Sequence, residues 1–99
     1  MLEHQKIEVL LVEDDPIQIE LMSLLLNKIG VNHISKASNY TEAIQNYKQK
    51  IPDIALIDIL LSKSKSGIEV AQFINQQEQP IPIIFITCLL YTSPSPRDS

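Results

Sequence analysis

The sequence predicts an α/β fold, a doubly wound parallel β-sheet with helices on both faces. Short apolar runs alternate along the chain with segments whose apolar residues recur at helical spacing, and the connections between them are short. No internal repeat interrupts this alternation. Strands that alternate with helices in this way are joined by right-handed crossovers, which make the sheet parallel.

Composition and charge limit the class of protein. The 99 residues are 44% hydrophobic and 20% charged, which is ordinary for one small globular domain. A net charge of −4 argues against nucleic-acid binding by this segment, because phosphate contacts need clustered Lys and Arg. The single cysteine, the N-terminus without a signal-peptide pattern and the absence of an apolar run near ~20 residues predict a cytoplasmic domain with no membrane partner.

The first strand is predicted at Ile7–Val12, an apolar run bounded by charges, as in a strand buried on both faces. Asp15 and Pro16 are suited to begin a helix, because Asp accepts hydrogen bonds from the first free amides and Pro fits the first turn. Gly30 is placed to end this helix. Its broad apolar face is expected to contain Ile17, Leu21, Met22, Leu24 and Leu25.

A second, weaker strand is predicted within residues 31–38 and a polar-faced helix within residues 39–50. Pro52 ends this helix, because the residue before a proline disfavours the helical conformation. The side chains expected to turn inward are Ala43, Ile44 and Tyr47.

Two further apolar strands are predicted, within residues 53–60 and 79–87, the latter after prolines that suit a strand's beginning. A polar loop and a short helix at residues 67–77 separate them. The helical side chains expected to be buried are Ile68, Ile74 and one of Val70 and Ala71.

The last residues have a different character. The stretch "CLLYTSPSPRD", residues 88–98, has neither helical nor strand periodicity and resembles the translation of a common transposase-based sequencing adapter. A natural Ser/Pro-rich linker is the alternative. The adapter interpretation predicts a partial domain at residues 1–87 and a non-native tail at residues 88–99, in which Cys88 has no redox role.

Three acids are placed to meet. Glu13 and Asp14 follow the first strand, and Asp58 ends the apolar strand that precedes the polar loop. The carboxyl ends of parallel strands share one edge of a sheet, so these side chains should converge there if the two strands are neighbours. Clustered carboxylates repel one another and tend to take up protons, whereas a hard cation such as Mg²⁺ reverses that interaction. Taken singly, Asp58 is as well explained as a cap of the following turn, and Asp14 and Asp15 as helix-capping acids.

The stretches "VLLVEDDP", "PDIALIDILLSKSKSGIEVA" and "PIIFIT" resemble the receiver domain of bacterial two-component response regulators, and the resemblance covers Lys6–Thr87. It implies a flavodoxin-like sheet of strand order 2-1-3-4-5. The fourth helix, fifth strand and fifth helix of that fold would be missing from this chain. The first helix should then be partly bare and the fourth strand an unprotected edge, which predicts aggregation or incomplete folding.

The resemblance also implies roles for single residues. Asp58 would be the phosphorylated aspartate. Asp14 would bind Mg²⁺ directly, Glu13 would hold it through water, and Asp58 and the backbone carbonyl of Leu60 would complete the protein ligands. The hydroxyl of Thr87 would hydrogen-bond the phosphoryl group.

Two departures from the family pattern stand out. Ser62 occupies a position at which many members have proline, and Gly67 comes one residue later than the usual glycine. The lysine that pairs with the phosphoryl group in the family would lie beyond Thr87, and Lys63 and Lys65 belong to the wrong loop to replace it.

The implied function is that of a phosphoryl-accepting module, which takes its phosphoryl group from a sensor histidine kinase or phosphotransfer protein. Such a module is not an enzyme beyond catalysing its own phosphorylation and dephosphorylation. Two alternatives stay open: a pseudo-receiver used for protein contacts, and a metal-dependent phosphohydrolase, which would need an acid where this chain has Leu60. The sequence leaves the oligomeric state, the kinase and any output domain undetermined.

Overall fold

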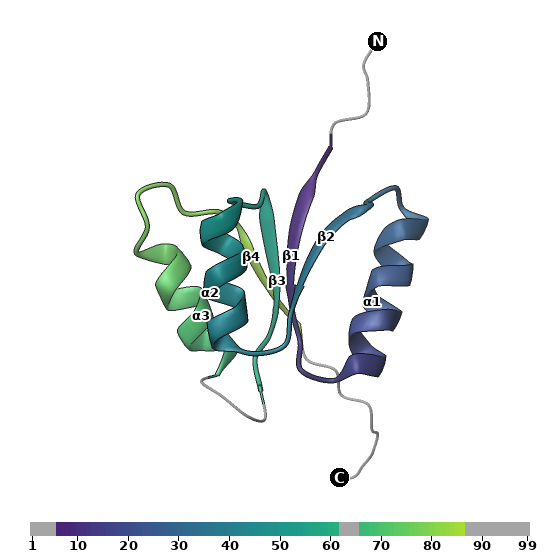
Figure 1. Cartoon of the computed structure of the whole chain (residues 1–99), viewed down its shortest axis with the longest axis horizontal. Coiled ribbons are helices and arrows are strands. Elements are labelled where there is room, and N and C mark those ends of the chain that lie inside the picture. Colours follow the sequence, from purple (N-terminus) through teal and green to yellow (C-terminus); the bar gives the residue numbers. More distant parts are fainter. Residues whose placement is uncertain (1–5, 62–65, 87–99) are drawn as a thin grey trace, which may run out of the picture.

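The computed structural model describes residues 6–61 and 66–86, which form alternating strands and helices (Figure 1). Every strand and helix predicted from the sequence is confirmed within these residues, with shorter ends in most cases. In chain order, the elements are β1 (Glu8–Val12), α1 (Pro16–Lys28), β2 (His33–Ala37), α2 (Tyr40–Gln49), β3 (Ile54–Asp58), α3 (Gly67–Asn75) and β4 (Ile83–Ile86).

All pairings in the sheet are parallel, and the strand order is β2-β1-β3-β4. β1 lies in the centre, so that Val9 pairs with Ile34 on one side and with Ile54 on the other. At the far end of β3, Asp58 pairs with Ile86 of β4. The doubly wound parallel fold is therefore confirmed, and the order agrees with the first four strands of the expected arrangement.

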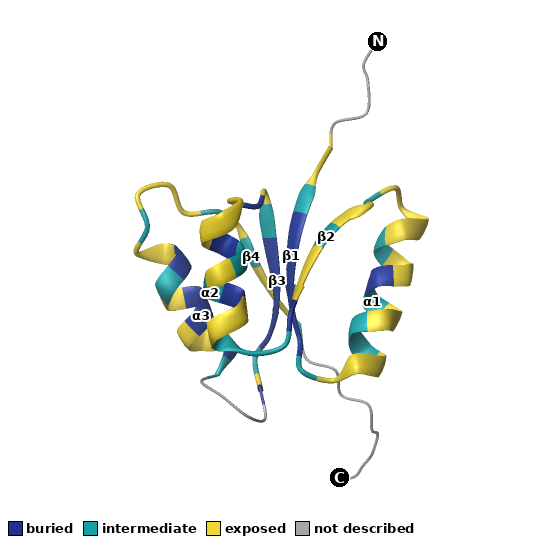
Figure 2. Ribbon diagram, in the orientation of Figure 1, coloured by how far each residue is buried: buried dark blue, intermediate teal, exposed yellow. Residues whose placement is uncertain are grey.

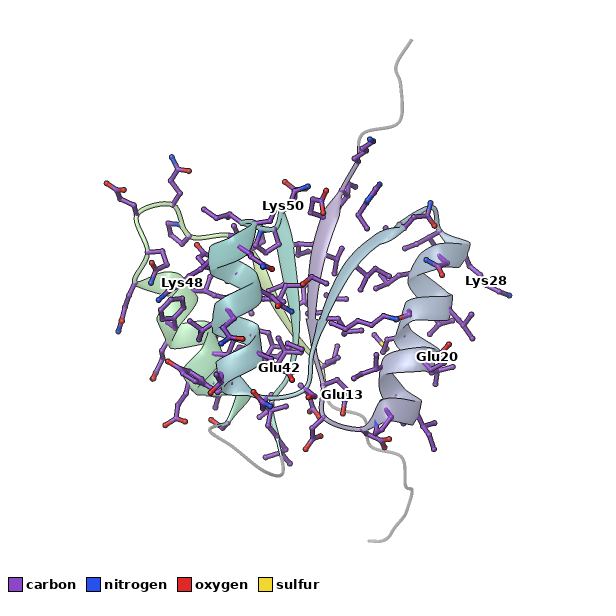
Figure 3. The ribbon with its side chains drawn as sticks, in the orientation of Figure 1. Glu13, Glu20, Lys28, Glu42, Lys48 and Lys50 are labelled. Carbon is purple, nitrogen blue, oxygen red and sulfur yellow. The ribbon has the colours of Figure 1, made fainter. Side chains whose placement is uncertain are left out.

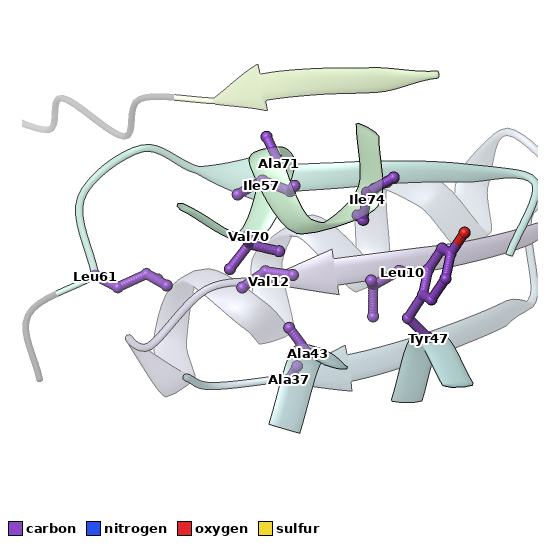
Figure 4. Packing of buried hydrophobic residues seen from close by; sticks show 11 residues of the cluster. Leu10, Val12, Ala37, Ala43, Tyr47, Ile57, Leu61, Val70, Ala71 and Ile74 are labelled. Carbon is purple, nitrogen blue, oxygen red and sulfur yellow. The ribbon is translucent and has the colours of Figure 1, made fainter. Parts of the chain in front are cut away.

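The sheet separates two apolar layers. Helix α1 covers one face, and α2 and α3 lie together on the other (Figure 1). The larger cluster lies beneath α2 and α3 (Figure 4). Its buried members are Leu10, Val12, Ala37, Ala43, Tyr47, Ala55, Ile57, Leu61, Val70, Ala71 and Ile74. The smaller one, on the α1 side, is built on Val9, Leu11 and Leu56.

Helix α1 contacts the sheet through only part of the apolar face that its pattern predicts. Ile19, Met22 and Leu26 pack on the smaller cluster, and Ser23 is buried beside them. The rest of the predicted face is mostly exposed, as the outer side of α1 in Figure 2 shows, and this agrees with the expectation that the first helix is partly bare. The exposed fractions are 73% for Ile17, 48% for Leu21, 53% for Leu24 and 51% for Leu25. The helix carries apolar side chains nearly all round, so spacing alone does not identify the side that packs.

The remaining helices agree better with their patterns. In α3, Val70, Ala71 and Ile74 are buried, so both candidates for the second core position are used. The prediction that Ile68 is buried is wrong, because this residue, in the first turn of α3, is 48% exposed. In α2 the inward side chains are as predicted, with Ala43 and Tyr47 buried and Ile44 half-buried.

Helix starts are fixed by local hydrogen bonds. The side chain of Asp15 accepts from the backbone N–H of Ile17 at 2.9 Å, which confirms the predicted cap of α1. The side chain of Asn39 accepts from the N–H of Glu42 at 2.8 Å at the start of α2. Gly30 follows α1 with φ of 95°, a backbone conformation that favours glycine.

Candidate metal centre at the carboxyl edge of the sheet

Three carboxyl groups meet where β1 and β3 end. β1 and β3 are paired neighbours, with Val12 opposite Ile57, so the residues that follow them emerge at the same edge. Carboxylate oxygens of Glu13, Asp14 and Asp58 all lie within 4.8 Å of one another. Figure 3 shows Glu13 at this edge of the ribbon. The structure thus brings together the three acids that the sequence singles out.

The site is more enclosed than a wet strand end would be. Glu13 is 2% exposed and Asp58 is 8% exposed, whereas Asp14 is half-buried. Asp58 is therefore largely enclosed, although it ends its strand. Asp14 provides the more accessible side of the cluster.

Burial raises the pKa of Glu13 to about 7. The backbone N–H of Asp15 donates to Glu13 Oε2 at 3.2 Å and opposes this rise, because it favours the ionised carboxyl group. Three smaller causes raise the pKa further. In decreasing order, they are the charge of Asp58, a side-chain hydrogen bond with Asp58 and the charge of Asp14. The raised pKa agrees with the proton uptake that the sequence predicts for crowded carboxylates, but burial is its largest cause.

Two backbone N–H groups that follow Asp58 in the chain help to fix its position. The N–H of the next residue, Ile59, donates to the carbonyl of Ile86 in β4 at 3.2 Å. The N–H of Leu60 donates to Asp58 Oδ1 at 3.2 Å. This second bond orients the carboxyl group and leaves Oδ2 as its other oxygen.

The donor set fits a hard divalent cation. Carboxylate oxygens are the ligands that Mg²⁺ takes from proteins, and one or two of them are enough. A cation among Glu13, Asp14 and Asp58 would offset the repulsion that raises the Glu13 pKa.

The roles predicted for the other site residues stay predictions. Leu60 is 72% exposed, and a ligand role for its carbonyl stays a prediction. Thr87, Ser62, Lys63 and Lys65 lie outside the described residues, as do the predicted domain boundary and tail.

Sequence reasoning missed one contact at this edge. Gly67 was noted only for its offset along the chain, yet its backbone lies against the carbonyl of Asp58. Its position at the start of α3, directly after the polar loop, was a signal that helix and strand approach closely there.

In open parallel α/β sheets, ligands bind outside the carboxyl ends of the strands, and this is where the three acids gather. The family model of the response regulator receiver domain matches residues 9–92. The chain therefore belongs to the response regulator receiver domain family.

Individual relatives agree with this assignment. The chain is 38% identical over 79 residues to the sensory transduction protein LytR of Staphylococcus haemolyticus, a match that covers 79% of this chain and 30% of LytR. It is 32% identical over 81 residues to the phyllosphere-induced regulator PhyR of Methylorubrum extorquens, covering 81% of this chain and 30% of that protein.

Solved structures show the same fold. The response regulator PhyR from Brucella abortus superposes with a TM-score of 0.75 at 28% identity, over 83% of this chain and 33% of that chain. The MaeR response regulator bound to beryllium trifluoride gives a TM-score of 0.76 at 27% identity, over 86% of this chain and 70% of that chain.

The chain spans about a third of the length of the first curated relatives it matches. In the part of the chain that the structure describes, no helix combines the length and apolar character needed to cross a bilayer.

Proposed function

We propose that this domain is a cytoplasmic phosphoryl acceptor of a two-component phosphorelay, with Asp58 as the residue that becomes phosphorylated. The donor is a phosphohistidine on a sensor histidine kinase or a phosphotransfer protein. Mg²⁺ is the proposed cofactor. The domain modifies itself and does not turn over a separate substrate.

The observation that carries this proposal is the grouping of Glu13, Asp14 and Asp58 at one edge of the sheet. Membership of the receiver family supports it. So does the MaeR structure with bound beryllium trifluoride, because beryllium trifluoride joined to a carboxylate oxygen is tetrahedral and has the shape of a phosphoryl group on that oxygen.

The proposed reaction is an in-line displacement at phosphorus. Asp58 attacks through Oδ2, since Oδ1 accepts the Leu60 N–H. The new bond joins the carboxylate oxygen to phosphorus, and the bond from phosphorus to the imidazole nitrogen breaks, with its electron pair staying on that nitrogen. The product is an acyl phosphate, the usual product of a carboxylate nucleophile.

Glu13, Asp14 and Asp58 would hold the cation, with the Leu60 carbonyl as a further ligand. When bound, Mg²⁺ offsets negative charge on the transferring group. The contribution of the chain itself is to keep the acceptor carboxyl group oriented and partly shielded from water.

The test uses a small-molecule donor, so that no cognate kinase is needed. The 99-residue chain is incubated with acetyl phosphate and Mg²⁺, and phosphorylation is followed by intact mass. We expect one phosphoryl group per chain, its loss in Asp58→Asn and its retention in Asp53→Asn. Asp53 is a suitable control because it is exposed and binds the Glu8 N–H at 2.8 Å, before β3 begins.

Two outcomes would contradict the proposal. Phosphorylation that persists in Asp58→Asn would reject Asp58 as the acceptor. A chain that is folded and binds Mg²⁺ but takes up no phosphoryl group would favour the pseudo-receiver alternative.

A further inference from the structure

Gly67, the first residue of α3, is placed where a side chain does not fit. An added Cβ would overlap the carbonyl oxygen of Asp58 and would lie 2.9 Å from its carbonyl carbon and 2.7 Å from Cγ2 of Ile57. The φ angle of Gly67 is not in the left-handed region, in which the structure places Gly30. Glycine is therefore needed here for space and not for backbone conformation.

The neighbours of Gly67 cannot easily move away. Ile57 is fully buried in the larger cluster, and the α3 residues Val70 and Ile74 are fully buried in the same cluster. The contacted carbonyl belongs to Asp58, whose following N–H, that of Ile59, is bonded to β4. Helix and strand are thus both anchored, and a side chain at position 67 would force one of them to shift at Asp58.

A single peptide unit connects this contact to the acceptor carboxyl group. The N–H of Gly67 donates to the carbonyl of Ile59 at 2.9 Å. The N–H of the same peptide unit, which belongs to Leu60, donates to Asp58 Oδ1 at 3.2 Å. One end of the peptide is held by Gly67 and the other end holds the carboxyl group.

We propose that Gly67 is a positioning residue for Asp58: its missing side chain lets the start of α3 clamp the peptide between Ile59 and Leu60, and the clamped N–H fixes the carboxyl group in its orientation. Gly67 acts through Leu60 and does not touch the reacting atoms. The consequence for phosphorylation rests on the proposed function, whereas the clamp itself does not.

The test compares Gly67→Ala with Gly30→Ala in the full chain. The Gly30 position has open space for a Cβ but a positive φ, so its variant loses stability without touching the site. We expect it to melt about 4–8 °C lower and to keep the wild-type rate of phosphorylation by acetyl phosphate. Gly67→Ala should lower that rate about tenfold or more, because a hydrogen bond to a charged group is lost.

A second readout is independent of phosphorylation. Hydrogen exchange at the Leu60 amide, measured by NMR without a phosphoryl donor, should be about tenfold faster in Gly67→Ala and unchanged in Gly30→Ala. An unchanged Leu60 amide in Gly67→Ala, or equal acceleration in both variants, would overturn the inference. If the wild-type chain accepts no phosphoryl group, the proposed function fails. Hydrogen exchange at the Leu60 amide still tests whether Gly67 holds the peptide between Ile59 and Leu60.

A third variant covers the case in which Gly67→Ala does not fold. Leu60→Pro removes the same N–H and replaces a side chain that is 72% exposed. We expect it to slow phosphorylation about tenfold as well. A wild-type rate in Leu60→Pro would show that the clamp does not orient Asp58.

Discussion

The carboxyl group of Glu13 shows how the fold changes the chemistry of one side chain. An acid after a strand is ordinary in sequence, but here it is 2% exposed and lies among Asp14 and Asp58. Its pKa of about 7 places its titration within the range in which cells work. Proton and metal ion are therefore alternative ways of relieving the same crowding.

This pKa predicts how stability depends on pH. The folded-state pKa of Glu13, about 7, lies above the ordinary value of 4.5, so the folded chain binds more protons than the unfolded chain between these pH values. The Glu13 contribution to stability is thus fully present below the ordinary value and is lost as pH rises through the folded pKa. Urea midpoints of the metal-free chain should fall across this window.

The matched control is Glu13→Gln, in which the urea midpoint should change much less with pH. Added Mg²⁺ should raise the wild-type midpoint most at the alkaline end, where Glu13 is ionised. A wild-type midpoint that rises with pH across the window, or a slope unchanged in Glu13→Gln, would show that another group controls the stability.

Ser23 offers a second test at this scale. Its hydroxyl group is buried in α1 with no hydrogen-bond partner. Ser23→Ala removes the desolvated group and improves helix propensity, so we expect a gain of about 0.5–1 kcal/mol in the free energy of unfolding. Ser38→Ala is the control and should lose stability, because its hydroxyl donates to Glu42 Oε1 at 2.9 Å. A loss of stability in Ser23→Ala would contradict this account.

At the scale of elements, the caps of the helices differ in ways that can be measured. The side chain of Asn39 caps α2 with a 2.8 Å hydrogen bond, whereas Ser66 at the start of α3 makes no side-chain cap bond. Asn39→Ala should therefore lower the free energy of unfolding by about 1 kcal/mol. Ser66→Ala should change it much less, and equal losses in denaturant titrations of both variants would contradict the assignment of the caps.

Most of the element order could be predicted from the sequence, because short apolar runs and capped amphipathic segments are local signals. The convergence of Glu13, Asp14 and Asp58 could also be predicted from the sequence, since neighbouring parallel strands end at a shared edge. For α1, the partly bare face and the inward Met22 were predicted, whereas the packing of Ile19 and Leu26 was not, because apolar residues surround the helix. The Gly67 contact depends on where α3 meets β3, which no local pattern records.

At the scale of the whole molecule, α1 and β4 each leave more than one large apolar side chain exposed. Helix α1 exposes the side chains of Ile17, Leu21, Leu24 and Leu25. The edge strand β4 exposes Ile84 and Phe85, which point to opposite faces of the sheet. Exposed apolar patches and unpaired strand edges both favour association.

We therefore expect the 99-residue chain to self-associate as its concentration rises. Replacing Leu21 with Lys and Leu25 with Glu should reduce the apparent mass measured by light scattering after gel filtration, since these side chains are exposed and their loss costs little packing. Thr41→Lys with Gln45→Glu, at exposed polar positions of α2, is the control. A wild-type chain that stays monomeric at high concentration, with a sharp cooperative melt, would contradict this expectation.

The central claim is that the carboxyl group of Asp58 accepts a phosphoryl group, and the most direct measurement is the position of that group in the chain. After reaction with acetyl phosphate and Mg²⁺, reduction with borohydride converts an aspartyl phosphate to homoserine, which peptide mass spectrometry locates. The account predicts homoserine at position 58 only, dependent on Mg²⁺ and absent from Asp58→Asn. Homoserine at Asp14 or Asp53, or none in a folded chain that binds Mg²⁺, would contradict it.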